Sequence, residues 1–221
     1  MRKRKMATLV AAGAVTVGGL AVAPLTFAAE APRNECADVQ LLGARGTTER
    51  PGFGVLIGPL ADRIVSDLPQ TVRATPVDYP ANFNYNASVR QGVTDLTEKM
   101  EDTAAACPQT TFVLAGYSQG ADVVGDAITG ELSDELVGKI SSVILFGDPT
   151  FTAGEDFNVT DGNRSGIFAR RAGSLDAVAD RTRSFCNRND RFCQGGTSLA
   201  AHLDYNKFIQ QATDFAAENA G

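Results

Sequence analysis

The chain has 221 residues, 43% of them hydrophobic, and carries 26 acidic against 20 basic side chains, a net charge of −6 with histidine neutral. That length suits one domain with a substantial core, and the acidic balance disfavours nucleic acid as a partner because phosphates are bound mainly through Lys and Arg. One histidine and no Cys-x-x-Cys spacing argue against zinc, so we expect no metal and no cofactor.

The first 28 residues are typical of a secretory signal peptide. The basic segment MRKRK precedes an uncharged run from Met6 to Ala29, and small residues surround the expected cleavage point after Ala28. An uncleaved membrane anchor is the alternative, since about 20 apolar residues can span a bilayer. Pro24 interrupts the run and no basic stop-transfer segment follows it. We therefore expect cleavage, a domain over residues 29–221, and a secreted protein without stable membrane insertion.

Four cysteines lie in the expected mature chain: Cys36, Cys107, Cys186 and Cys193. In an exported protein this even number indicates two disulfide bonds, for which three pairings are possible. The nested pairing, Cys36 with Cys107 and Cys186 with Cys193, is favoured because the last two cysteines are close in sequence.

Segments typical of strands alternate with segments typical of helices along the rest of the chain. The expected strands are residues 37–46, 71–79, 110–118 and 141–149. The expected helices are residues 54–68, 87–107, 120–128 and 201–221. The polar stretch 150–166 is expected to be a long loop. This alternation favours an α/β fold with a mainly parallel central sheet that helices cover on both faces, and we find no break that would divide it into two domains.

The sequence GYSQG, residues 116–120, matches the G-x-S-x-G pattern of a nucleophile elbow. It directly follows the apolar run TFVLA and precedes a segment compatible with a helix, which is the context that gives the pattern meaning. Glycine on either side allows the strand and the helix to approach closely, while the serine is held in a strained conformation. The pattern predicts Ser118 as a nucleophile at the carboxyl end of the sheet.

A serine hydroxyl needs a general base to act as a nucleophile at neutral pH. His202 is the only histidine in the chain, so it must be that base. It follows Ser118 in sequence, as the base does in α/β hydrolases, and it is expected to enter the final helix.

The acid that orients the imidazole has nine aspartate candidates between the serine and the histidine. Asp122 and Asp126 lie on the helix expected after the serine and point away from the end of its strand. Asp148 is a rival because it ends an expected strand, although it could simply form a turn beside Pro149. Asp190 is favoured: a disulfide across CNRNDRFC, residues 186–193, would hold it within reach of the imidazole, which a free loop could not do.

These motifs together resemble those of cutinase-family serine esterases. The resemblance covers nearly all of the mature chain and rests on LLGARGTTE (residues 41–49), GYSQGA, the bracketed CNRNDRFC, and the histidine at the head of the expected last helix. It implies a compact α/β hydrolase without a lid, with Ser118, Asp190 and His202 as nucleophile, acid and base.

The resemblance also places an oxyanion hole at Thr47 and Gln119. This agrees with the general arrangement in hydrolases, where one amide follows the nucleophile and another comes from a loop after an early strand. Thr47 could instead be only a turn residue. Phe83, Phe192 and Leu199 are candidates for an apolar rim that binds substrate, although each could equally be core or plain surface.

The sequence thus predicts a secreted, monomeric serine hydrolase that cleaves carboxylic esters of short to medium acyl chains, on a lipid, a polyester or an acylated polysaccharide. The alternatives are an acetylxylan esterase, an esterase or thioesterase acting on lipids of the cell envelope, and a non-catalytic envelope protein on a hydrolase scaffold. The complete set of triad candidates argues against the last of these.

Overall fold

The structure is a computed structural model that describes residues 36–220. The expected signal peptide and its cleavage point after Ala28 lie outside the described residues. Within this part of the chain, no helix is both long enough and apolar enough to cross a membrane.

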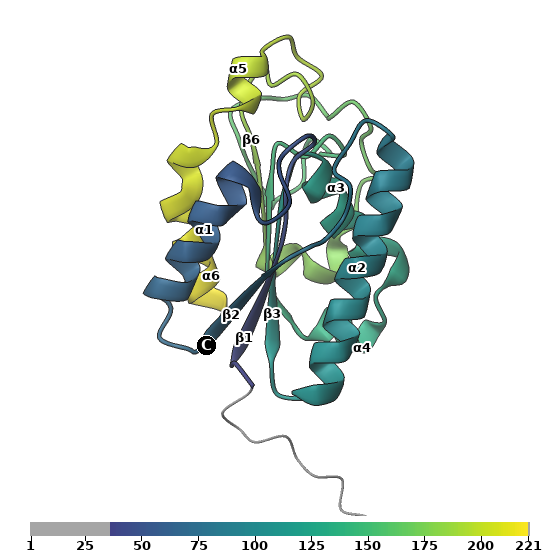
Figure 1. The fold of residues 1–221 in the computed structure, drawn as a ribbon. Helices are drawn as coiled ribbons and strands as arrows, with labels where there is room; N and C mark the ends of the chain where they lie inside the picture. Colours follow the sequence, from purple (N-terminus) through teal and green to yellow (C-terminus); the bar gives the residue numbers. More distant parts are fainter. Residues whose placement is uncertain (1–35, 221) are drawn as a thin grey trace, which may run out of the picture. The chain divides into compact units, whose positions relative to one another are not determined.

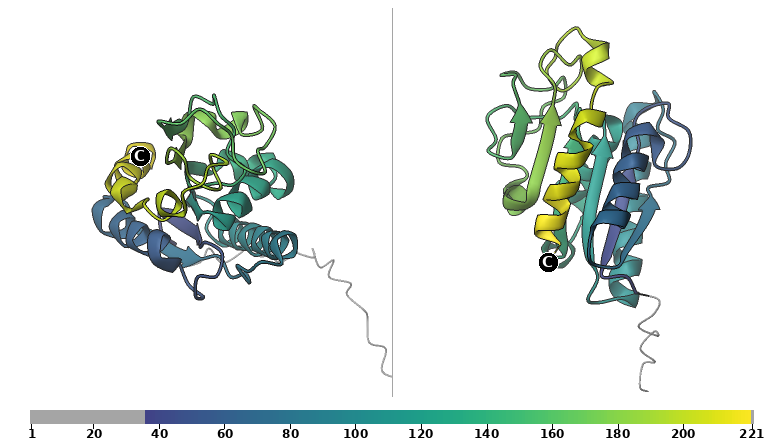
Figure 2. Two further views of the ribbon diagram at one scale, coloured as in Figure 1. Left: turned by 90° about the horizontal axis from the view of Figure 1, so that it is seen from above. Right: turned by 90° about the vertical axis from the view of Figure 1, so that its left-hand side faces the viewer.

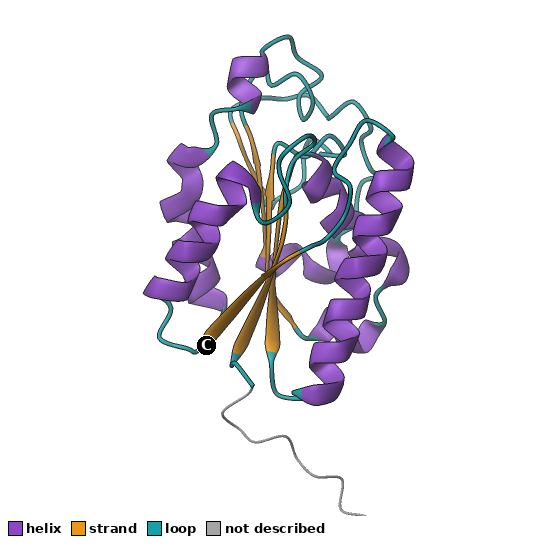
Figure 3. Ribbon diagram, viewed as in Figure 1, coloured by secondary structure: helices purple, strands orange, loops and turns teal. Residues whose placement is uncertain are grey.

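A single parallel sheet of six strands forms the centre of the described domain (Figure 1). The strand order is β2-β1-β3-β4-β6-β5, and all five pairings are parallel. The strands are β1 (Val39–Ala44), β2 (Val72–Pro76), β3 (Thr111–Tyr117), β4 (Ile140–Phe146), β5 (Asn158–Thr160) and β6 (Thr182–Cys186). Since the strands are parallel, their carboxyl ends meet at one edge of the sheet, and the loops that follow them gather there (Figure 3).

Helices cover both faces of the sheet (Figures 1 and 2). The helices are α1 (Gly54–Asp67), α2 (Tyr85–Ala106), α3 (Gln119–Asp126), α4 (Asp134–Gly138), α5 (Leu199–His202) and α6 (Ile209–Asn219). A π-helical turn (Ala127–Glu131) and 3-10 turns (Asp176–Arg181 and Asn206–Phe208) complete the set. Helices α1 and α6 lie side by side on one face, and α2 packs against α3 on the other. The expected α/β fold is confirmed.

Strand β3 shows why the central strands are apolar throughout. Phe112 and Leu114 face the core beneath α2 and α3, while Val113 and Ala115 face the core beneath α1 and α6. All four side chains are fully buried. A strand that is buried on both faces needs apolar residues at every position, which is why TFVLA is a continuous apolar run.

The C-terminal helix expected over residues 201–221 is instead divided into α5 and α6. The side-chain amide of Asn187 donates hydrogen bonds to the carbonyl oxygens of Ala201 and Asp204, at 2.8 and 3.0 Å. These carbonyls would serve as acceptors inside a continuous helix. His202 is therefore the last residue of the short α5 and does not stand at the head of the final helix.

Two strands, β5 and β6, fall where the sequence predicted none. Strand β5 lies inside the segment 150–166 that was expected to be a loop. In β6, Thr182 and Ser184 are buried, and Arg183 lies over the ring of Phe215 at 4.4 Å. Because its first three residues, Thr182, Arg183 and Ser184, are all polar, β6 lacks the apolar run that revealed β3 and β4.

The nested disulfide pairing is confirmed. Cys36 is bonded to Cys107, which joins the segment before β1 to the end of α2. Cys186, the last residue of β6, is bonded to Cys193.

Candidate active site

Ser118 occupies the tight turn between β3 and α3. Its backbone angles are φ 53° and ψ −119°, a conformation that costs a non-glycine residue about 1–3 kcal/mol. The turn is possible because its flanking glycines lack side chains. A Cβ on Gly116 would lie 2.4 Å from the carbonyl oxygen of Gly120, and one on Gly120 would lie 2.1 Å from that of Ala44. The serine hydroxyl is thereby held at the carboxyl end of the sheet.

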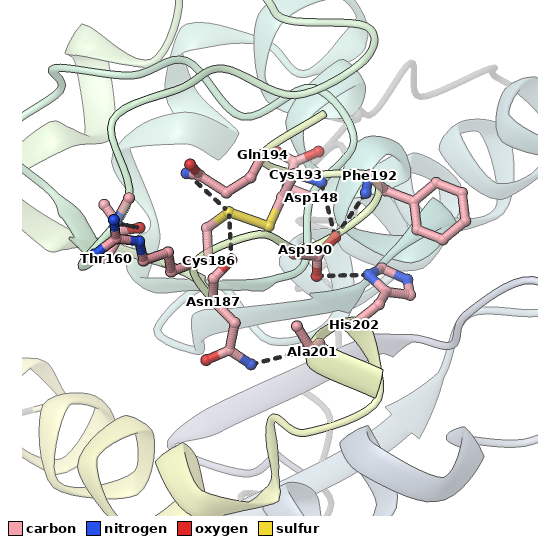
Figure 4. The surroundings of a disulfide bond; sticks show 12 residues. Asp148, Thr160, Cys186, Asn187, Asp190, Phe192, Cys193, Gln194, Ala201 and His202 are labelled. Atoms are coloured by element: carbon pink, nitrogen blue, oxygen red, sulfur yellow. Dashed lines mark hydrogen bonds and ion pairs between the residues drawn. A yellow bond between two sulfur atoms is a disulfide. The ribbon is translucent and has the colours of Figure 1, made fainter. Parts of the chain in front are cut away.

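The hydroxyl of Ser118, the imidazole of His202 and the carboxylate of Asp190 form a continuous chain of hydrogen bonds. Ser118 Oγ lies 3.0 Å from His202 Nε2, and His202 Nδ1 lies 2.8 Å from Asp190 Oδ2. Figure 4 shows the bond between the aspartate and the histidine. With its proton on Nδ1, a neutral imidazole donates to Asp190 and leaves Nε2 free to accept the proton of the serine.

The Asp190 carboxylate is fully buried and receives three further hydrogen bonds. Oδ1 accepts from the backbone amides of Phe192 and Cys193, at 2.7 and 3.1 Å, and Oδ2 accepts from the hydroxyl of Tyr205 at 2.7 Å. Burial by itself raises the pKa of Asp190, but the hydrogen bonds and the attraction of His202 outweigh it and hold that pKa below its ordinary value. The carboxylate is therefore ionised at neutral pH.

The disulfide loop positions Asp190 relative to the sheet (Figure 4). Cys186 ends β6, so the bond to Cys193 anchors the far side of the loop to a strand of the sheet. Gln194 Nε2 lies 3.4 Å from Cys186 Sγ, and Asn187 binds the segment that carries His202. The loop thus contacts both the sheet and the segment of the base.

Two tyrosines that the sequence analysis did not single out complete the surroundings of the triad. The ring of Tyr117 stacks on the imidazole of His202, and its hydroxyl donates to the carbonyl oxygen of His202 at 2.9 Å. The hydroxyl of Tyr205 accepts from the amide of Asn187 at 3.1 Å while it donates to Asp190. Burial raises the pKa of Tyr205, so its hydroxyl keeps the proton that it donates. The only signal in the sequence that could have found them is their position: Tyr117 directly precedes Ser118, and Tyr205 follows His202 by three residues.

Asp148 does not contact the imidazole in this arrangement. Its Oδ2 accepts from Arg170 at 2.9 Å and its Oδ1 from the amide of Thr150 at 2.8 Å. Asp122 and Asp126, on α3, also bind Arg170, at 2.9 and 3.2 Å. Burial, reinforced by the neighbouring Asp126, raises the pKa of Asp122 to about 7 against the opposing effect of Arg170. The geometry thus brings Asp190, and not its rival Asp148, to His202.

The backbone amide of Gln119 is suited to bind an oxyanion. Gln119 is the first residue of α3, so its amide has no acceptor within the helix. Its side chain is buried and occupied elsewhere: Oε1 accepts from Ser88 at 2.8 Å, and Nε2 donates to the carbonyl of Asn82 at 3.0 Å. The side chain therefore fixes the start of the helix and leaves the amide available.

Thr47 lies in the loop after β1 and lines the same cleft as Ser118. Two neighbouring charged residues hold this loop. Arg45 is buried, with Nε donating to the carbonyl of Glu49 at 3.0 Å and one Nη donating to the carbonyl of Tyr79. The Glu49 carboxylate accepts from the amides of Gly46 and Val55, at 2.5 and 2.8 Å. The sequence pattern contained Arg45 and Glu49 but gave no sign that they shape the loop.

An open cleft of about 610 Å³ contains Ser118 and His202. The three residues proposed from sequence as its rim, Phe83, Phe192 and Leu199, all line it. So do four exposed apolar residues that the sequence analysis did not name: Val55, Ile167, Phe168 and Leu203. Among residues 36–220, Val65 is the one exposed large hydrophobic side chain that lies elsewhere. Exposed apolar surface is therefore concentrated around the nucleophile.

No cluster of three or more His, Cys, Asp or Glu side chains that could hold a metal ion occurs among the described residues.

A parallel sheet with a serine elbow at its carboxyl edge and a histidine and an aspartate in bonding distance defines the class of α/β hydrolases. The chain belongs to the cutinase family, whose model matches residues 35–220. It is 30% identical to the carboxylesterase Culp1 of Mycobacterium tuberculosis, over 98% of this chain and 97% of the relative. It is 34% identical to a cutinase of Kineococcus radiotolerans, over 77% of this chain and 56% of the relative.

Two acetylxylan esterases and a further cutinase are also among the similar proteins. Acetylxylan esterase 2 of Talaromyces purpureogenus is 28% identical, over 94% of this chain and 97% of the relative. A solved acetyl xylan esterase superposes with a TM-score of 0.79 at 29% identity, over 84% of this chain and all of that one. A solved Trichoderma reesei cutinase in complex with a phosphonate inhibitor superposes with a TM-score of 0.67 at 30% identity, over 84% of this chain and 78% of that one.

Proposed function

We propose that the protein is a serine esterase that hydrolyses carboxylic esters through an acyl-serine intermediate. The observation that carries this proposal is the chain of bonds from Ser118 to His202 to Asp190, at 3.0 and 2.8 Å, inside an open apolar cleft. Membership of the cutinase family and the similarity to named carboxylesterases, cutinases and acetylxylan esterases support it.

In the first half of the reaction, Ser118 Oγ attacks the ester carbonyl carbon as His202 Nε2 takes its proton. Asp190 holds the imidazole in the orientation that accepts this proton and stabilises the imidazolium that forms. The amides of Thr47 and Gln119 bind the oxygen on which negative charge develops, a contribution of about 3–4 kcal/mol per donor in comparable hydrolases. His202 then gives the proton to the leaving alcohol, and the acyl group stays on the serine.

In the second half, a water molecule replaces the alcohol. His202 takes a proton from the water as it attacks the acyl-serine carbonyl, and the same two amides hold the second oxyanion. The intermediate collapses with return of the proton to Ser118 Oγ, which releases the carboxylic acid. Every proton transfer is thus assigned to one imidazole, and the mechanism requires no metal or cofactor.

The cleft supports a preference for esters with short to medium acyl chains, including esters presented on a lipid, a polyester or an acylated polysaccharide. The lining residues Phe83, Ile167, Phe168 and Leu203 are roughly half exposed or more, so an apolar group that binds there removes their surface from water. We assign Phe83, Phe192 and Leu199 to substrate binding on this basis. An acetylxylan esterase is the second candidate, because several of the similar proteins carry that name.

The experiment is a series of p-nitrophenyl esters of increasing acyl length, run beside acetylated xylan and a polyester film. We expect turnover of the p-nitrophenyl esters, and covalent labelling by a fluorophosphonate probe that is lost in Ser118→Ala. Strict preference for acetyl groups together with release of acetate from xylan would favour the second candidate. Labelling or turnover that survives in Ser118→Ala would overturn the proposal.

Export and oligomeric state belong to the same proposal. We propose that residues 1–28 are removed on secretion and that the mature domain is a monomer. N-terminal sequencing of the protein recovered from the culture medium tests the first statement, with Ala29 expected as the first residue. Light scattering during gel filtration tests the second, and a dimer mass would contradict it.

A further inference from the structure

Arg170 lies largely, though not completely, buried where α3, the end of β4 and the segment 166–170 meet. We call this segment the cleft loop. The Arg170 side chain is only 10% exposed; one Nη donates to Asp148 Oδ2, and the other donates to the carbonyl oxygen and Oδ1 of Asp122, all at 2.9 Å. A Cβ on Gly125 would lie 2.3 Å from the guanidinium. Helix α3 therefore has room for this side chain only because residue 125 is glycine.

The cleft loop forms one wall of the cleft. Ile167 and Phe168 line the cleft with 47% and 55% of their surface exposed, so core packing does not fix them. Their backbone amides are bound instead: Phe168 donates to the carbonyl of Pro149, and Ile167 donates to the carbonyl of Phe192, both at 2.9 Å. Arg170 anchors the end of the same segment to α3. The position of the wall thus depends on these polar contacts.

Asp122 also holds the aromatic ring against which this wall packs. Its Oδ2 accepts from the hydroxyl of Tyr85 at 3.0 Å, while its Oδ1 binds Arg170. The rings of Tyr85 and Phe168 are 5.5 Å apart, and both line the cleft that contains Ser118. One carboxylate on the helix after the nucleophile therefore connects both rings to that helix.

We propose that Arg170, through Asp122 and Asp148, is a positioning residue that fixes the wall formed by Phe168 and Tyr85 and so determines the preference for esters with medium-length apolar groups over acetyl esters. An acetyl ester needs only the triad and the oxyanion amides. A longer apolar group gains from the surface that it buries against the two rings. The inference rests on the proposed esterase function and names a determinant of its specificity.

The test compares Arg170→Gln with the unmodified enzyme on two ester series, one varying the acyl group and one varying the alcohol. In at least one of the two series, we expect the ratio of kcat/KM for the eight-carbon ester to that for the smallest ester to fall about tenfold. Most of this fall should come from a higher KM for the eight-carbon ester. Arg63→Gln is the matched control, because Arg63 is exposed on α1 and paired with Asp67 outside the cleft. That variant should keep the ratio.

Phe168→Ala provides a second arm, since Phe168 is half exposed and its loss should leave the fold intact. We expect it to lower the same ratio, with little additional loss in the double variant with Arg170→Gln. Should Arg170→Gln not fold, Tyr85→Phe takes its place, because it deletes only the hydroxyl that reaches Asp122. A ratio that is unchanged in both series would overturn the inference, and this includes an equal fall in kcat/KM for small and large esters. Failure of the proposed function shows separately, as turnover that does not depend on Ser118.

Discussion

At the scale of single residues, the site depends on donors that keep one carboxylate ionised and oriented. Asp190 receives hydrogen bonds from two backbone amides, one tyrosine and His202. The tyrosine and the histidine share Oδ2, so the strength of one bond affects the other. Tyr205 is therefore the residue whose removal should change the chemistry without removing a triad member.

Tyr205→Phe should lower kcat about tenfold, because Asp190 loses a donor that holds its carboxylate in the orientation that directs the imidazole. Deprived of this donor, Asp190 stabilises the imidazolium of His202 more strongly, so the acid limb of the pH–rate profile should move to higher pH. Steady-state rates from pH 5 to 9 measure both effects. A purely structural role would lower the rate at every pH without moving the limb, and that result would contradict the prediction.

Asp122→Asn should change the pH dependence of stability. The pKa of Asp122 is raised to about 7 by burial, so between about pH 4 and 7 the folded protein binds a proton that the unfolded chain does not. Stability due to this group therefore falls as the pH rises through that range. Lowering the pH from 8 to 5 should stabilise the unmodified protein relative to Asp122→Asn by about 3 kcal/mol.

Urea unfolding at the two pH values measures this difference, with the disulfides intact. Asp62→Asn is the control, because Asp62 is exposed on α1. An equal stability difference between the unmodified protein and Asp122→Asn at pH 5 and pH 8 would show that this carboxyl does not take up the proton.

At the scale of elements, the two disulfides have different tasks. The bond between Cys36 and Cys107 closes a loop with a sequence separation of 71 residues, far from the triad. The bond between Cys186 and Cys193 spans a separation of only 7 and encloses Asp190. Since the stabilisation by a disulfide grows with the length of the loop that it closes, the bond between Cys36 and Cys107 should contribute more to stability. The bond between Cys186 and Cys193 should contribute more to catalysis, because its loop holds Asp190.

Replacing Cys36 and Cys107 by serine should lower the free energy of unfolding by about 4 kcal/mol and leave kcat unchanged. Replacing Cys186 and Cys193 should cost about 2 kcal/mol in stability and lower kcat more than it raises KM. Calorimetry and steady-state kinetics on the two double variants make the comparison. The idea that the short disulfide serves Asp190 fails if both variants retain full kcat.

At the scale of the whole molecule, the features that could be predicted from sequence are those that short local patterns of residues encode. The alternation of strand and helix segments indicated the α/β fold, the glycines around Ser118 indicated the elbow, and the single histidine indicated the base. Strand β6 was missed because Thr182 and Ser184 are buried polar residues. The division between α5 and α6 was missed because it depends on Asn187, 14 and 17 residues earlier in the chain, which binds the carbonyls of Ala201 and Asp204.

The same limit applies to the site. Asp190 could be favoured over Asp148 because the cysteines that bracket it are visible in the sequence. Nothing local indicates that Tyr205 would bond to Asp190, or that Arg170 would reach Asp122 from 48 residues away. These contacts arise only when the carboxyl ends of several parallel strands meet at one edge of the sheet.

The central claim is that Ser118 and His202 act as one unit, and the kinetics of a double variant test it most directly. We expect Ser118→Ala and His202→Ala each to lower kcat for a p-nitrophenyl ester by about 10⁶-fold, with almost no further loss when both are combined. Losses that multiply in the double variant would show two groups acting independently and would contradict the account.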